Sequence, residues 1–194
     1  MASISEKAKQ MPASAIRKLV PFADAAKKEG VKVYHLNLGQ PDIKSPSCAL
    51  EAIRGYAQEN VSYSHSAGLM ELRKGLVEKY YKKIGIDICV DELIVTVAGS
   101  ESVNLALEIA CNPGDEVIVL EPFYTNYNTF AFMNGLTLKA IPTDIRKGFQ
   151  IPPIEEFEKA ITEKTKAILV CNPGNPTGTQ YSKESMLALG EIAR

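Results

Sequence analysis

The sequence predicts an α/β protein in which helices cover both faces of a mostly parallel sheet. Short apolar runs alternate with segments of helical spacing over most of the 194 residues. Parallel strands need a crossover connection, which is usually a helix, so this alternation is typical of three-layer α/β/α domains. The short apolar runs also lack the polar alternation of strands that face water, which favours a sheet buried on both faces.

The first part of the chain predicts an N-terminal arm. Ser14 to Lys28 has the apolar spacing of a helix, but Pro21 interrupts it because proline cannot donate the hydrogen bond of a helix interior. Gly30 then stands where a helix would end. Val31 to Leu38 alternates between apolar and polar residues, which predicts a strand, and Gly39 begins a sharp turn after it.

Strands and helices then alternate to the last residue. Four apolar runs predict strands, at Leu93 to Val97, Glu116 to Leu120, Leu136 to Ile141 and Ala167 to Val170. Helices are predicted from Ser45-Pro46 to about Gln58, from Leu69 to Gly85 (on the spacing of Leu69, Leu72, Leu76 and Tyr80), and over Glu101 to Ala110, Tyr124 to Asn134, Ile154 to Ile161 and Ser182 to Arg194. We therefore assign residues 1–45 to an arm and a small-domain segment, and residues 46–194 to the N-terminal part of a larger domain.

The composition excludes several classes of function. With 45% apolar residues, 23% charged residues and a formal net charge of -1, the chain can build a core but shows no basic surface for nucleic acid or an anionic membrane. No signal segment opens it, and no apolar run approaches the roughly 18 residues that cross a bilayer, so we expect a cytoplasmic location. The cysteines, which are expected to be free thiols and to form no metal site, are Cys48, Cys89, Cys111 and Cys171.

A candidate anion site follows the strand predicted at Leu93 to Val97. Gly99-Ser100 ends that strand and Glu101 continues into a helix, so unpaired backbone N–H groups and the positive helix end would face the same point. A phosphate fits such a place. The alternative is that Ser100 simply caps the helix.

Two further features follow neighbouring strands. Tyr124 comes after the strand that ends at Leu120, and Asn175 lies in the loop Asn172-Pro173-Gly174-Asn175-Pro176-Thr177-Gly178 after the last strand. The carboxyl edge of an open α/β sheet is where ligands bind. Tyr124 could stack on a planar ligand or pack in the core, and the Asn-Pro steps could make only a tight turn. Together with the anion site, they suit a flat, phosphorylated cofactor such as pyridoxal phosphate.

The motifs of this chain resemble those of one enzyme family, the class I/II aminotransferases, which are fold-type I pyridoxal-phosphate enzymes. The similarity runs from Val33 to the end and is greatest to aspartate and aromatic aminotransferases, of which the chain resembles the N-terminal half. The matching motifs are Leu38-Gly39-Gln40-Pro41-Asp42, Tyr63 with Gly68 and Leu72-Arg73, Asp115-Glu116-Val117-Ile118-Val119, and Asn172-Pro173-Gly174-Asn175-Pro176-Thr177-Gly178.

The resemblance implies a role for each matching residue. Gly99, Ser100 and Glu101 would hold the phosphate of pyridoxal 5'-phosphate. Tyr124 would stack on the pyridine ring, and Asn175 would bond the ring's 3-oxygen and help to place the substrate carboxylate. The remaining implied roles belong to two residues: Gly39 would line the substrate carboxylate pocket, and Tyr63 would reach the cofactor phosphate of the neighbouring subunit in a homodimer. Arg73 is expected to be a helix-face ion-pair or interface residue.

By the same resemblance, the lysine that forms a Schiff base with the cofactor belongs downstream of Arg194, and the last helical pattern has no cap. We therefore expect a truncated aminotransferase, transferring an amino group between an amino acid and a 2-oxo acid at full length, with no turnover from these 194 residues alone. Two alternatives stay open. One is another fold-type I activity, such as a C–S lyase or an acyltransferase. The other is a complete, non-catalytic module for anion binding or assembly.

Overall fold

The computed structural model describes residues 3–14, 16–57 and 59–194, and the chain divides into two compact units. The first unit contains Met1–His35 and Val103–Arg194, and the second contains Leu36–Ser102. We describe each unit by itself. The predicted division at residue 45 stays a prediction.

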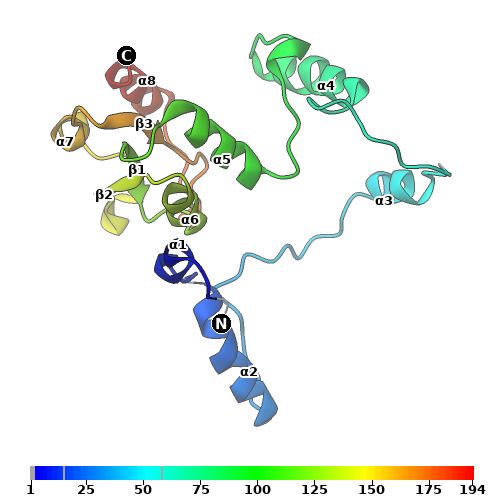
Figure 1. Ribbon diagram of the computed structural model, residues 1–194, viewed down its shortest axis with the longest axis horizontal. Helices are drawn as coiled ribbons and strands as arrows, with labels where there is room; N and C mark the ends of the chain where they lie inside the picture. Colours follow the sequence, from blue (N-terminus) through cyan, green and yellow to red (C-terminus); the bar gives the residue numbers. More distant parts are fainter. Residues whose placement is uncertain (1–2, 15, 58) are drawn as a thin grey trace. The chain divides into compact units, whose positions relative to one another are not determined.

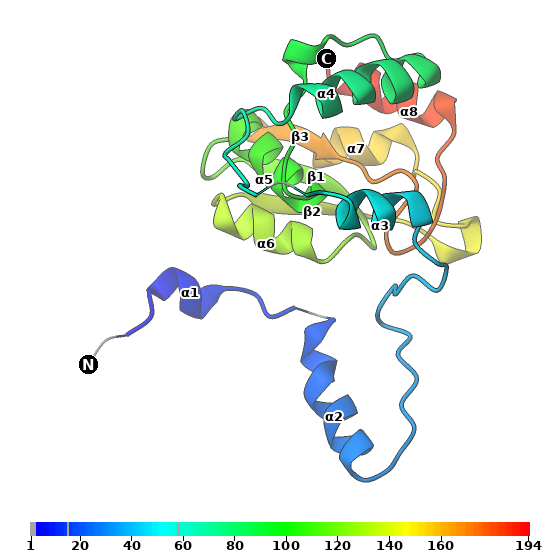
Figure 2. The same ribbon diagram turned by 90° about the vertical axis from the view of Figure 1, so that its right-hand side faces the viewer.

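A three-stranded parallel sheet forms the centre of the first unit (Figures 1 and 2). Its strands are β1 (Glu116–Glu121), β2 (Thr137–Pro142) and β3 (Thr165–Leu169), in the order β2-β1-β3. In the central strand, Val119 lies opposite Ala140 of β2 and Leu169 of β3. Helices cover both faces of the sheet, so the side chains of β1 are buried on both faces and its sequence reads as a continuous apolar run.

Helices cover both faces of this sheet, as the sequence predicts. Helices α5 (Gly99–Ala110) and α6 (Asn126–Met133) pack on one face, where Leu107 and Ala131 meet Val117 of β1. Helices α7 (Ile154–Ala160) and α8 (Lys183–Ile192) pack on the other face, where Phe157 and Leu189 meet Ile118. Because successive side chains of a strand point to opposite faces, β1 supplies a core residue to each layer.

The N-terminal arm also belongs to the first unit. It contains α1 (Glu6–Gln10), a 3-10 turn at Arg17–Leu19 and α2 (Val20–Lys28). Pro21 stands in the first turn of α2, where its missing N–H costs nothing, and Gly30 has a positive φ of 80° just after the helix. The predicted break of the arm at Pro21 is therefore confirmed.

The second unit is built from short helices. These are α3 (Ser47–Arg54), α4 (Met70–Leu76), a π-helical turn at Val77–Tyr81 and 3-10 turns at Lys82–Ile84 and Val90–Glu92. The helical run that starts at Met70 ends at Gly85, which has a φ of 76°. Another 3-10 turn, Ile145–Lys147, lies in the first unit after β2.

The structure corrects the two other predicted strands. Neither Val31 to Leu38 nor Leu93 to Val97 is a strand, because neither pairs with a strand among the described residues. A β-strand needs a neighbour to satisfy its backbone groups. Within residues 93–97, the one backbone hydrogen bond that we find to a segment distant in the sequence joins the N–H of Val95 to the carbonyl of Ala67, at 3.0 Å.

One helix prediction is corrected and another is confirmed. The helix predicted from Ser45-Pro46 ends at Arg54, where Gly55 caps it, and the predicted end at Gln58 lies outside the described residues. Its N-cap is Pro46, with no side-chain capping bond, so Ser45 does not cap it. The helix predicted from Leu69 to Gly85 is confirmed as a helical run that begins at Met70 and ends at Gly85. Leu69, Leu72 and Tyr80, whose spacing predicts it, are exposed, and its buried residues are Arg73 and Val77.

Candidate functional site

The loop after β3 forms a closed turn that presents Asn175. The N–H of Gly174 donates to the carbonyl of Thr179 and the N–H of Gly178 donates to the carbonyl of Gly174, both at 2.7 Å. The Asn172–Pro173 and Asn175–Pro176 peptide bonds are both cis. Gly174 leaves no room for a side chain, because a Cβ there would lie 2.5 Å from Oγ1 of Thr177.

The two asparagines of this loop have different roles. The side-chain oxygen of Asn172 accepts a hydrogen bond from the N–H of Tyr181 at 3.0 Å, which ties the loop to the start of the following segment. The side chain of Asn175 is exposed, and we find no hydrogen bond from it to the described residues. Asn175 is therefore the one of the two whose side-chain oxygen and nitrogen both lack a hydrogen-bond partner that we find among the described residues.

A shallow depression lies at the carboxyl ends of β1 and β3. It brings the loop of Asn175 next to the turn that follows β1. Its lining residues are Leu120, Pro122, Phe123, Tyr127, Leu169, Cys171, Gly174, Asn175 and Tyr181. This is the edge of the sheet at which the sequence predicts a site.

Tyr124 lies beside this depression and does not line it. Its hydroxyl accepts a hydrogen bond from the side-chain amide of Asn126 at 2.7 Å. Its ring makes an edge-to-face contact with the ring of Tyr127, with centroids 5.5 Å apart. The ring is half-buried, so one part packs in the unit and another stays accessible.

Three residues in the depression were missed by the sequence analysis, namely Tyr127, Cys171 and Tyr181. Burial raises the pKa of Tyr127 to about 12, helped by a hydrogen bond with Cys171, and burial also raises the pKa of Tyr181. Both phenols therefore stay protonated near neutral pH and can act as hydrogen-bond donors. The one sequence signal for this group is Cys171 itself, which immediately precedes the Asn-Pro motif.

The start of α5 has the features of an anion site. The N–H groups of Gly99 and Ser100 donate to no acceptor that we find in the described part of the chain, whereas the next two N–H groups donate to the carbonyl of Ala98. A Cβ built on Gly99 would meet nothing within 4 Å. Free N–H groups at a helix start, with open space before them, suit a phosphate.

The side chains around this turn hold its shape. The carboxylate of Glu101 accepts from the N–H of Val97 at 2.6 Å, so it folds back onto the backbone before the helix. The hydroxyls of Thr96 and Ser102 bond to each other at 2.6 Å. Ser100 is the second residue of α5 and does not cap it, which removes the simple capping interpretation of this residue.

The other predicted residues, Gly39 and Tyr63, lie in the second unit. Gly39 is exposed, with open space around it. The side chain of Tyr63 is fully exposed, with 105% of its reference area accessible, so it touches little within its own unit. Nearby, Nδ1 of His65 accepts from the N–H of Ala67 at 3.1 Å, which closes the loop that follows Tyr63.

The described residues contain neither a candidate metal site nor a helix that could cross a membrane. No group of three or more His, Cys, Asp or Glu side chains is placed to hold a metal ion there. Across residues 3–14, 16–57 and 59–194, no helix is both long enough and apolar enough to cross a membrane.

These features describe an α/β protein with a shallow depression at the carboxyl edge of a parallel sheet and a helix start whose first two N–H groups are free among the described residues. A model of the family "Aminotransferase class I and II" matches residues 31–194. The chain belongs to this family, which confirms the resemblance that its motifs suggest.

Individual relatives agree with this assignment. The chain is 35% identical over 194 residues to an aspartate/prephenate aminotransferase of Thermus thermophilus, and the match covers 100% of the chain and 50% of that relative. It is 33% identical over 192 residues to an aspartate aminotransferase of Thermotoga maritima, covering 98% of the chain and 51% of the relative. The chain therefore spans about half the length of the curated relatives that it matches.

Solved structures show the same relation. An aspartate aminotransferase of Thermus thermophilus, a single mutant, has a TM-score of 0.91 at 36% identity, covering 100% of this chain and 50% of that one. An alanine aminotransferase from Pyrococcus furiosus also has a TM-score of 0.91 at 36% identity, covering 98% of this chain and 49% of that one. The fold of the chain is that of the first half of these enzymes.

Proposed function

We propose that the whole protein is a pyridoxal-phosphate-dependent aminotransferase that transfers an amino group between an amino acid and a 2-oxo acid. The observation that carries this proposal is the start of α5, where Gly99 and Ser100 offer two free backbone N–H groups in a chain of this family. Bound pyridoxal phosphate supplies the electron sink for such a reaction. The donor set of the turn fits the phosphate of that cofactor.

The residues of the chain bind and orient the cofactor in this proposal. Gly99, Ser100 and Glu101 form the turn that receives the phosphate, and the hydroxyl of Ser100 adds a donor to the two amides. Tyr124 presents a ring for stacking, and the free amide of Asn175 donates to a ring oxygen or a substrate carboxylate. Each contact fixes the position of the ring without taking part in a bond change.

Two further residues complete the proposed assignments. Gly39 leaves open space in which a substrate carboxylate could lie. Tyr63, whose side chain is fully exposed, would reach the cofactor phosphate of a second subunit, so we propose a homodimer. We also propose a cytoplasmic enzyme.

The amino-acid substrate is proposed from the relatives. Aspartate, prephenate and alanine appear in the names of the matching proteins, so aspartate and alanine are the first amino donors to assay. We expect no turnover from the 194 residues alone, because the family resemblance places the lysine that carries the cofactor downstream of Arg194. Turnover from the purified 194-residue polypeptide would overturn this expectation.

The test of the proposed function compares two ligands that differ in one group. Pyridoxine 5'-phosphate and pyridoxine have no aldehyde, so they cannot react with surface lysines, and calorimetry on the full-length protein would measure their affinities. We expect at least about a tenfold preference for the phosphorylated ligand, since a charge-assisted hydrogen bond contributes about 1.5–3 kcal/mol and 1.4 kcal/mol is tenfold in affinity.

A matched pair of variants sharpens this test. Ser100→Ala removes the hydroxyl donor of the turn and is expected to reduce the preference for pyridoxine 5'-phosphate, while Ser47→Ala, in the exposed first turn of α3, is expected to leave it unchanged. Equal affinities of the wild-type protein for the two ligands would contradict the phosphate site. Binding of inorganic phosphate but neither pyridoxine compound would favour the anion-binding module.

A further inference from the structure

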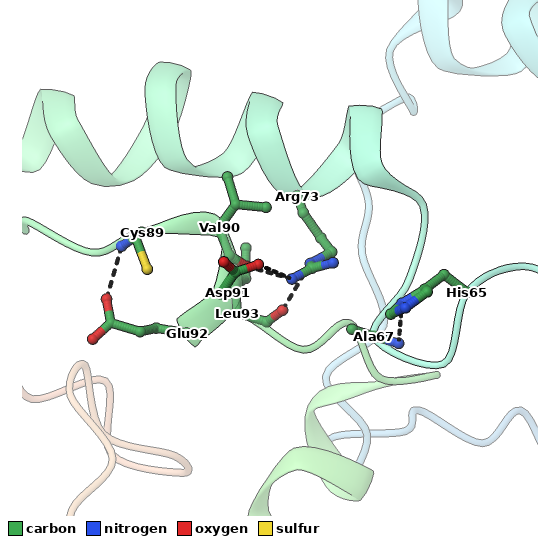
Figure 3. A network of polar contacts seen from close by, with 8 residues as sticks. All are labelled: His65, Ala67, Arg73, Cys89, Val90, Asp91, Glu92 and Leu93. Atoms are coloured by element: carbon green, nitrogen blue, oxygen red, sulfur yellow. Dashed lines mark hydrogen bonds and ion pairs between the residues drawn. The ribbon is translucent and has the colours of Figure 1, made fainter.

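One buried charge in the second unit is not explained by the proposed cofactor contacts. Arg73 in α4 is only 4% exposed, although arginine is almost never buried unless it is paired. Its Nε donates to the carbonyl of Leu93 at 2.9 Å and its Nη2 donates to the carbonyl of Val90 at 2.5 Å (Figure 3). The guanidinium therefore bridges both ends of one short segment, residues 90–93.

The ion pair of Arg73 is the weaker part of its surroundings. Nη2 lies 3.7 Å from the carboxylate of Asp91, whose side chain is 94% exposed, so water screens this pair. Two short bonds from a buried guanidinium to carbonyl oxygens are worth more than an exposed pair at that distance. The geometry shows a planar donor that fixes backbone, which lysine cannot reproduce because it is a point charge.

The segment that Arg73 fixes leads directly to the anion-accepting turn. After Leu93 the backbone passes through Val95 and reaches Gly99 within six residues. On its other side, the N–H of Val95 donates to the carbonyl of Ala67 at 3.0 Å. A Cβ at Gly68 would lie 2.6 Å from Cβ of Val95, so the loop that follows Tyr63 rests closely on the same segment.

These contacts hold residues 93–97 in place, as pairing with a neighbouring strand holds a β-strand. Residues 93–97 have no partner strand among the described residues, so no ladder of hydrogen bonds fixes their position. Figure 3 shows the side chain of Arg73 reaching from its helix to this segment, with the loop of His65 and Ala67 nearby. The turn at Gly99 thus depends on Arg73 and on the Gly68 contact for its position within the second unit.

We propose that Arg73 is a positioning residue, which sets the direction of the free N–H groups at the start of α5 relative to the loop that carries Tyr63. It does so through the carbonyls of Val90 and Leu93 and touches no ligand. The proposal rests on the proposed function for the identity of the ligand. In this proposal, the relative positions of Ser100 and Tyr63 depend on the buried guanidinium of Arg73.

The test measures the ratio of affinities for pyridoxine 5'-phosphate and pyridoxine in full-length variants. Arg73→Gln is expected to lower the preference for the phosphorylated ligand by about tenfold, which corresponds to the loss of about one charge-assisted bond, and to leave the affinity for pyridoxine within about twofold. Arg73→Lys keeps the positive charge but loses the planar pair of donors, so its preference for the phosphorylated ligand should lie between those of wild type and Arg73→Gln. Asp91→Asn, which removes only the exposed partner, should behave as wild type. A purely structural role would lower both affinities together and leave their ratio unchanged, which would overturn the proposal.

Hydrogen exchange keeps the proposal testable if Arg73→Gln does not fold. In Arg73→Lys, the hydrogen-bonded amides within residues 95–102, those of Val95, Val97, Glu101 and Ser102, should exchange at least about tenfold faster than in wild type, while the amides of β1 should not change. Unchanged exchange at residues 95–102 would contradict the positioning role. If the wild-type protein shows no preference for the phosphorylated ligand, the proposed function fails, and this exchange experiment still decides whether Arg73 positions the turn.

Discussion

The two units of this chain differ in what stabilises them. In the first unit, a buried strand lies between two others, and its side chains join two apolar clusters, one on each face. In the second unit, a buried arginine and single backbone bonds hold an extended segment that has no partner strand among the described residues. Apolar burial therefore fixes the sheet, whereas directional polar contacts fix the backbone before the start of α5.

The largest expected effect lies in the first unit. Phe157→Ala removes a side chain with 0% exposure from the cluster between α7, α8 and the sheet. It should lower the free energy of unfolding by about 3–5 kcal/mol, since it leaves a large cavity. Urea unfolding followed by circular dichroism would measure this, with Ile145→Ala, at a side chain that is 72% exposed, as the control. A loss similar to that of the control would show that the cluster does not stabilise the unit.

A smaller effect is expected at the glycine that supports the second unit. Gly68 has a φ of 98°, and a Cβ there would lie 2.6 Å from Cβ of Val95. Gly68→Ala should therefore destabilise this unit by about 1–3 kcal/mol, through backbone strain and overpacking. Gly75→Ala is the matched control, because a Cβ at this helical glycine meets nothing within 4 Å and alanine favours a helix by about 1 kcal/mol. Hydrogen exchange of residues 93–97 would measure both variants. Equal exchange in both variants would contradict the importance of the close contact.

The smallest expected effect is a pH dependence of stability at Glu92, in the 3-10 turn Val90–Glu92. The carboxylate of Glu92 accepts from the N–H of Cys89 at 2.8 Å, and this bond lowers the pKa of Glu92 below its ordinary value of 4.5. A lowered folded-state pKa means that the bond stabilises the fold above pH 4.5 and that this stability is lost as the pH falls through the folded-state value. The difference in stability between wild type and Glu92→Gln should therefore be small at pH 7 and should shrink further as the pH falls below 4.5. A stability difference between wild type and Glu92→Gln that grows as the pH falls would contradict a stabilising bond between Cys89 and the Glu92 carboxylate.

The sequence predicts the first unit well because its elements carry their own signals. The strand at Glu116–Glu121 is a continuous apolar run, and the break at Pro21 and the helix end at Gly30 follow from backbone chemistry. Local pattern and tertiary packing agree there, as they do wherever a sequence is consistent across levels.

The second unit was predicted less well because its partners are not local. Residues 93–97 have the composition of a strand, but pairing depends on a neighbour that no local pattern reveals. Arg73 appears in the sequence as one more charged residue on a helix, and its burial depends on carbonyls 17 and 20 residues away. The same limit applies to the candidate site, where Asn175 was found from its motif, and Tyr127 and Tyr181 needed the arrangement of β1 and β3.

Ligand binding at the start of α5 should raise the thermal stability of the unit that contains the sheet. The helix begins at Gly99 with two free amides, and farther along it Leu107 is packed against the sheet. A ligand that binds only the folded turn stabilises the folded state by mass action, by about 2.7 kcal/mol at 100 times its dissociation constant. Because one helix carries both the turn and Leu107, that gain should appear as a higher melting temperature of the sheet unit, so a thermal-shift screen of phosphorylated compounds would report occupancy of a turn that contains no chromophore.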